Sequence, residues 1–101
     1  MTFDPDLISR AIVVWPGSGS TPWPSRSEDR LISEFGMHLA IDLFAIVCKL
    51  RDEFYASDAR DTARDLSEMG SLAAAKFRKL HPELSDDSIQ AFAWCYTFDY
   101  K

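Results

Sequence analysis

Few side chains of this 101-residue sequence have the types and the spacing that catalysis or metal binding requires. His38 and Asp42 lie four residues apart and would share one face of a helix, as a pair of metal ligands does. The sequence has only two histidines, however, and it contains no second pair that would complete the coordination. We therefore interpret His38 and Asp42 as surface residues, and we predict no metal and no cofactor.

The two cysteines, Cys48 and Cys95, each lie among apolar residues. A cysteine in such a run is more often a small core residue than a ligand or a nucleophile. No His or Asn at a familiar spacing supports a catalytic thiol, and no acid, base and nucleophile converge elsewhere. We predict buried, reduced thiols, which are typical of a cytoplasmic protein, and we predict no catalytic residues and no enzymatic activity.

Residues 17–21 read Gly-Ser-Gly-Ser-Thr, which invites comparison with phosphate-binding loops. A Walker loop needs a lysine before its Ser or Thr, and a dinucleotide loop needs a third glycine. Both are missing, so we interpret residues 16–27, rich in Pro, Gly and Ser, as a connecting loop. We expect Trp23 in this loop to dock on the core. The alternative is an aromatic, partner-binding surface formed by Trp15 and Trp23.

Charge is concentrated between residues 51 and 68, which hold six acidic and three basic side chains. The whole chain has 16 acidic and 11 basic residues and a net charge of −5. A solvated helix face explains this stretch most simply, but clustered carboxylates also steer a protein toward a basic partner. On that hypothesis two aromatic residues provide the apolar anchor. The predicted partner-binding residues are Asp52, Glu53, Phe54, Tyr55, Asp58, Asp61, Asp65 and Glu68.

Other partners are less compatible with the sequence. Residues 76–88 have the outline of a helix-turn-helix, but the helix that follows has no Lys or Arg before Lys101 to contact phosphates. No window approaches the roughly 18–20 apolar residues of a membrane span. Residues 1–6 carry acid where a signal peptide needs base. We predict no binding to nucleic acid or membrane.

Four segments have apolar residues at helical spacing, and these elements must position the side chains above. We expect helices over residues 5–13, 28–55, 58–80 and 86–96. Breaks at Gly36 and at Gly70 remain open alternatives within the second and third segments.

Capping residues support the first and last of these helices. Asp4-Pro5 and Ser85 are typical helix starts. The aromatic residues between Phe92 and Tyr100 also alternate as in a strand, but the cap at Ser85 favours a helix to about Tyr96, with an extended end. The predicted core comprises Leu31, Phe35, Leu39, Leu43, Ile46, Val47, Leu50, Leu66, Ala73, Phe77, Leu80, Ile89 and Phe92.

Together these patterns predict an all-α, single-domain bundle of four or five helices over residues 1–101, with the long loop at residues 16–27 after the first helix. Two functions remain. The first is a small acidic protein–protein interaction module that occupies a basic site on a protein partner, as immunity proteins, antitoxins and inhibitors of bacterial origin do. The alternative is a structural or regulatory homodimer with an aromatic interface or a small-molecule pocket.

Overall fold

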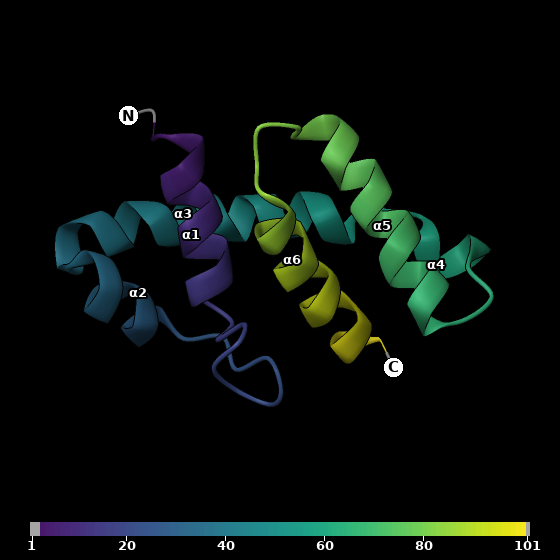
Figure 1. Ribbon diagram of the computed structural model, residues 1–101, viewed down its shortest axis with the longest axis horizontal. Helices are drawn as coiled ribbons and strands as arrows, with labels where there is room; N and C mark the ends of the chain where they lie inside the picture. Colours follow the sequence, from purple (N-terminus) through teal and green to yellow (C-terminus); the bar gives the residue numbers. More distant parts are fainter. Residues whose placement is uncertain (1–2, 101) are drawn as a thin grey trace.

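The computed structural model describes residues 3–100, apart from the side chain of Arg60, and this part of the chain is helical without strands. The predicted all-α fold is confirmed. Residues 1, 2 and 101 of the predicted domain lie outside the described part. The helices are α1 Pro5–Val14, α2 Glu28–Phe35, α3 Met37–Tyr55, α4 Ala59–Thr62, α5 Leu66–Leu80 and α6 Asp86–Asp99 (Figure 1). Five of them have eight residues or more, and α4 is a single turn.

The helices form two layers. The shortest dimension of the fold is 18 Å, which accommodates two helices of about 10 Å diameter. In Figure 1, α3 runs along the back of the molecule, and α1, α6 and α5 cross in front of it. Helix α2 folds back at one end of α3, and α4 lies near the other end, beside α5.

The predicted helix over residues 28–55 is divided at Gly36. This glycine has φ +85° and ψ 158°, a conformation that L side chains rarely adopt, and it separates α2 from α3. The alternative of a break at this glycine is therefore confirmed.

The predicted helix over residues 58–80 breaks before α5 begins, and the alternative of a break at Gly70 is wrong. Ala63 and Asp65 are extended, and the Asp65 side chain accepts a hydrogen bond of 2.8 Å from the backbone N–H of Glu68, which starts α5. Gly70 lies inside α5, where a Cβ would stand 2.9 Å from Cγ2 of Thr97 on α6. Gly70 thus permits a close crossing of two helices.

Helix α6 is longer than predicted and continues to Asp99, so the expected extended end is wrong. Its start is as predicted, because the Ser85 hydroxyl accepts a hydrogen bond of 3.2 Å from the N–H of Ser88. The helix packs against α1, α3 and α5 and buries side chains on several faces, including Ala91, Phe92 and Tyr96. Burial on more than one face explains why its aromatic pattern resembles a strand.

The core is centred on aromatic rings of α3, α5 and α6. The ring centroid of Phe54 lies 5.2 Å from that of Phe77, 5.7 Å from that of Phe92 and 5.6 Å from that of Tyr96. Most predicted core residues are buried or packed against this core. Leu66 and Leu80, the first and last residues of α5, are exceptions, exposed by 40% and 67%.

Candidate functional site

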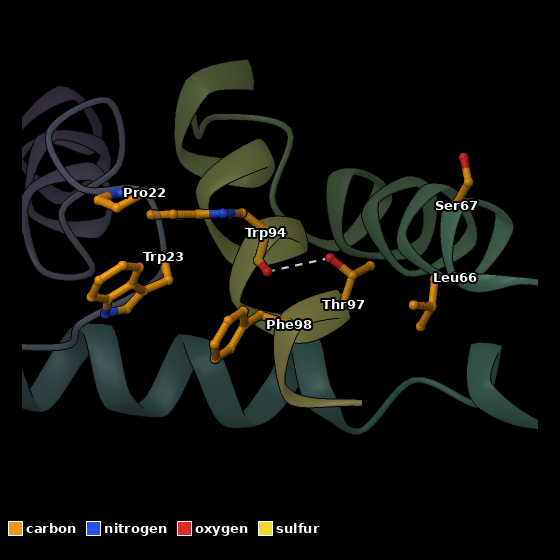
Figure 2. A pocket seen from close by; sticks show the side chains of 7 residues that line it. All are labelled: Pro22, Trp23, Leu66, Ser67, Trp94, Thr97 and Phe98. Atoms are coloured by element: carbon orange, nitrogen blue, oxygen red, sulfur yellow. Dashed lines mark hydrogen bonds between the residues drawn. The ribbon is translucent and has the colours of Figure 1, made fainter. Parts of the chain in front are cut away.

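An open groove lies where the loop between α1 and α2 approaches α5 and α6. Its first part has a volume of about 500 Å³. Figure 2 shows Trp94 extending from α6 toward Pro22, with Trp23 and Phe98 beside it. Trp23 is 57% exposed, which contradicts the prediction that it docks on the core, whereas Trp15 is buried. The alternative surface that pairs Trp15 with Trp23 is therefore reduced to Trp23.

The groove continues along the crossing of α5 and α6. A second hollow of about 280 Å³ shares four residues with the first and extends it past Gly70. We call the two together the aromatic groove. Its lining residues are Pro22, Trp23, Leu66, Ser67, Gly70, Ser71, Gln90, Ala93, Trp94, Thr97 and Phe98.

None of the described residues that line the aromatic groove is charged. Other hollows of the molecule differ in this respect. The hollow between α1 and the start of α6 contains Asp6, Arg10 and Asp87. Since 27% of the residues in the chain are charged, an uncharged, aromatic groove is a distinct feature of this surface.

The loop that carries Trp23 is attached to α6 by hydrogen bonds among Arg26, Tyr55 and Asp99, which we call the Asp99 clamp. The Arg26 guanidinium donates two hydrogen bonds to the Asp99 carboxylate, of 2.9 and 3.1 Å. The Tyr55 hydroxyl at the end of α3 donates a third, of 2.5 Å. Burial, together with the hydrogen bond to Asp99, raises the pKa of Tyr55 well above its usual value. Tyr55 therefore remains a protonated donor at neutral pH.

The base of the loop is fixed as well. The backbone N–H groups of Ser25 and Ser27 donate to the carbonyl oxygens of Pro16 and Trp15, each at 3.1 Å. The Arg30 side chain donates to the carbonyl of Ser25 and, at 2.7 Å, to its hydroxyl oxygen. The backbone on both sides of Trp23 is thus held while its indole ring stays exposed.

The predicted acidic surface differs from the groove, because most of its carboxylates already contact a basic side chain of the same chain. Asp52 pairs with the adjacent Arg51 at 2.9 Å, and Asp58 pairs with Lys76. Glu53 Oε2 lies 2.7 Å from His81 Nε2.

The carboxylates around α4 and α5 have similar partners. Glu68 pairs with Arg64 at 2.8 Å, and Asp65 caps α5, while Asp61 is exposed on α4. Few carboxylates of this stretch are therefore without a basic neighbour in the same chain.

The two aromatic residues predicted as apolar anchors lie elsewhere than expected. Phe54 is 1% exposed and occupies the centre of the core, so its side chain does not protrude as an anchor for a partner. Tyr55 is half-buried and belongs to the Asp99 clamp. The structure thus separates these residues from a surface role and assigns both to structural contacts.

The remaining candidates for chemistry are dispersed. His38 and Asp42 are exposed on α3, and within residues 3–100 no three His, Cys, Asp or Glu side chains are placed to hold a metal ion. Cys48 and Cys95 are free thiols. Burial raises the pKa of Cys48, and it raises the pKa of Cys95 to about 11, which keeps that thiol protonated at neutral pH. No helix of the described chain is both long enough and apolar enough to cross a bilayer.

Of the eleven residues that line the aromatic groove, the sequence analysis predicts only Trp23 as a site residue; the large apolar side chains of Leu66, Trp94 and Phe98 are additional. One signal in the sequence points to Leu66. Asp65-Leu66-Ser67-Glu68 has the spacing of a helix-capping sequence, which places Leu66 in the first turn of a helix. Comparison of the chain with known protein families, with curated proteins and with solved structures finds no match to any of them.

Proposed function

We propose that this protein is a protein–protein interaction module, and that the aromatic groove binds a segment of a partner that carries Lys or Arg beside an apolar side chain. The observation that carries the proposal is the composition of the groove. The cores of protein interfaces are depleted of charge and enriched in aromatic residues, and Trp is prominent among residues that dominate binding energy. Trp23, Trp94 and Phe98 meet in a groove without charge.

The rigidity of the loop supports the same proposal. Binding costs free energy when mobile groups must be ordered, and a surface that is already fixed avoids much of this cost. The Asp99 clamp and the hydrogen bonds at the base of the loop fix the backbone of Trp23 before any partner is bound. An exposed indole on a fixed backbone is a suitable anchor.

Charge at the edge of the groove indicates the chemistry of the partner. Asp65 and Glu68 flank Leu66 and Ser67, which line the groove in the first turn of α5. The partner of Glu68, Arg64, has an 86% exposed side chain. An ion pair in water at such exposure is weak, so a cation from a partner can replace Arg64. The net charge of −5 favours a basic partner in addition.

An inhibitor-like role, in which the chain acts by occupying its partner as immunity proteins and antitoxins do, extends this proposal. We also propose a cytoplasmic location. The two cysteines support this location, because both are free thiols.

The proposal is tested with a phage-displayed library of random peptides, selected on the immobilised full chain. The selected peptides are then measured for binding to purified wild-type protein and to Trp23→Ala. We expect selection of an apolar or aromatic residue next to Lys or Arg, and an affinity at least about tenfold lower for Trp23→Ala.

Ile41→Ala is the matched control. Ile41 is 62% exposed, similar to Trp23, but it lies on α3 outside the groove. This variant should bind the selected peptides as wild type does. Equal binding to wild type and Trp23→Ala, or selection of acidic sequences, would contradict the proposal.

A further inference from the structure

A hollow distinct from the aromatic groove lies between the C-terminal part of α3 and helix α5. Its volume is about 320 Å³. Phe54, Ala73 and Phe77 form its apolar floor, each 1% exposed. Its charged lining residues are two carboxylates of the predicted acidic surface, Glu53 and Asp58, and Lys76 of α5. We call this hollow the α3–α5 cleft.

The rim carboxylates can accept a further cation. Glu53 contacts His81 and Asp58 contacts Lys76, but their side chains remain 40% and 61% exposed. A carboxylate has about four lone-pair sites on its two oxygens, so one cation does not saturate it. The cleft therefore has the chemistry to receive an apolar side chain that is flanked by a basic residue.

The end of α5 presents that same combination. Leu80 is 67% exposed, the highest value among the large exposed hydrophobic residues of the described chain, and the preceding Lys79 is exposed as well. Leu80 also lies at the rim of the α3–α5 cleft. The apolar anchor and the site that would receive it thus belong to one patch, as a two-fold symmetric interface requires.

We infer that two copies of the chain associate through this patch. In the dimer, Leu80 of each copy covers the apolar floor of the cleft in the other, and Lys79 approaches the rim carboxylates of the other copy. The contact is charge-complementary, because Lys79 lies at the end of α5 and the rim from α3 and the following turn carries the exposed carboxylates of Glu53 and Asp58, of which Asp58 also pairs with Lys76. It uses none of the residues of the aromatic groove, so dimerisation and partner binding are independent.

Sedimentation velocity of the full chain, from about 1 µM to about 200 µM, tests this inference. We expect the wild-type protein to shift from monomer to dimer as its concentration rises. Leu80→Ala should weaken the association at least about tenfold, since it removes the apolar anchor twice per dimer. Ile41→Ala, which truncates a similarly exposed residue on α3, should leave the association unchanged.

A charge exchange tests the pairing in the dimer. Lys79→Glu alone should weaken association, because a carboxylate then faces the acidic rim. Adding Asp58→Lys to Lys79→Glu should restore much of the affinity. A wild-type protein that remains monomeric at the highest concentration overturns the inference, and so does a Leu80→Ala variant that dimerises as wild type does.

Discussion

The aromatic groove and the acidic stretch over residues 52–68 use surface in opposite ways. The stretch carries many charges, yet Asp52, Glu53, Asp58 and Glu68 each contact a basic side chain of the same chain. The groove carries no charge, and its most exposed ring, Trp23, has no role in the core. The fold thus neutralises much of the acidic surface internally and leaves the aromatic surface open.

This difference shows that the number of charges in a segment does not measure the charge that a partner meets. Paired carboxylates still contribute to the long-range field that steers association. They contribute little to the contact itself, where apolar anchors on a fixed backbone dominate. Under the proposed function, the acidic stretch would steer a partner and the aromatic groove would anchor it.

The largest effect is expected beneath the groove, at Gly70. Gly70→Leu places a side chain where even a Cβ would lie 2.9 Å from Cγ2 of Thr97. Overpacking of this kind lowers the free energy of unfolding by about 1–3 kcal/mol. Urea unfolding measures it, with Ser71→Leu on the exposed side of α5 as the control that should change much less.

A rescue variant sharpens this test. Thr97→Ser removes the methyl group that meets the Cβ and keeps the hydroxyl, which donates 2.9 Å to the carbonyl of Ala93. In the Thr97→Ser background, Gly70→Ala should cost less than in wild type. Equal costs in both backgrounds would show that the helices do not cross closely at this point.

The second effect concerns alkaline pH and the thiol of Cys95 on α6. Burial raises its pKa from 9.0 to about 11. Below pH 9 the thiol is protonated in both states, so its stabilising contribution is complete. As pH rises from 9 to about 11 the unfolded chain loses the proton first, and stability falls by up to about 1.4 kcal/mol per pH unit.

Denaturant unfolding at several alkaline pH values checks this expectation. Tyr55, whose pKa is also raised, adds to the loss at higher pH. Cys95→Ala should therefore reduce the dependence on pH without abolishing it, whereas Cys48→Ala should reduce it less because Cys48 is only half-buried. A Cys95→Ala protein with the full dependence would contradict the assignment.

The smallest effect compares Asp99, which supports the loop beside the groove, with Asp52 of the acidic stretch. Asp99→Asn weakens three hydrogen bonds of the Asp99 clamp, where the carboxylate is 27% exposed, and should cost about 1 kcal/mol of unfolding free energy. Asp52→Asn affects one pair at a carboxylate that is 71% exposed and should cost close to zero. Equal costs, measured by thermal and urea unfolding, would remove the difference between the two regions.

Much of the fold follows from local signals in the sequence. Helical spacing of apolar residues predicts the main helices, and Asp4-Pro5 and Ser85 correctly predict two starts. The start of α5 was missed although Asp65 and Glu68 form a capping pair there, because the periodic pattern of apolar residues continues across the break. Local periodicity does not reveal a break that leaves the spacing intact.

The aromatic groove was less predictable, because it forms from three segments that meet only in the folded chain. Pro22 and Trp23 come from the loop, Leu66 from α5 and Phe98 from α6. Nothing local to Trp23 distinguishes an exposed ring from a docked one. The contact that joins its loop to α6 is between Arg26 and Asp99, which are 73 residues apart in the sequence.

The central claim is that Trp23 and Trp94 form the contact surface for a partner. The most direct test is a nuclear magnetic resonance titration of nitrogen-labelled protein with a peptide selected from the random library. The three tryptophans each give one indole N–H signal, and the buried Trp15 provides an internal control. We expect the signals of Trp23 and Trp94 to shift and that of Trp15 to remain in place. Shifts confined to residues 52–68, with the signals of Trp23 and Trp94 unchanged, would contradict the claim.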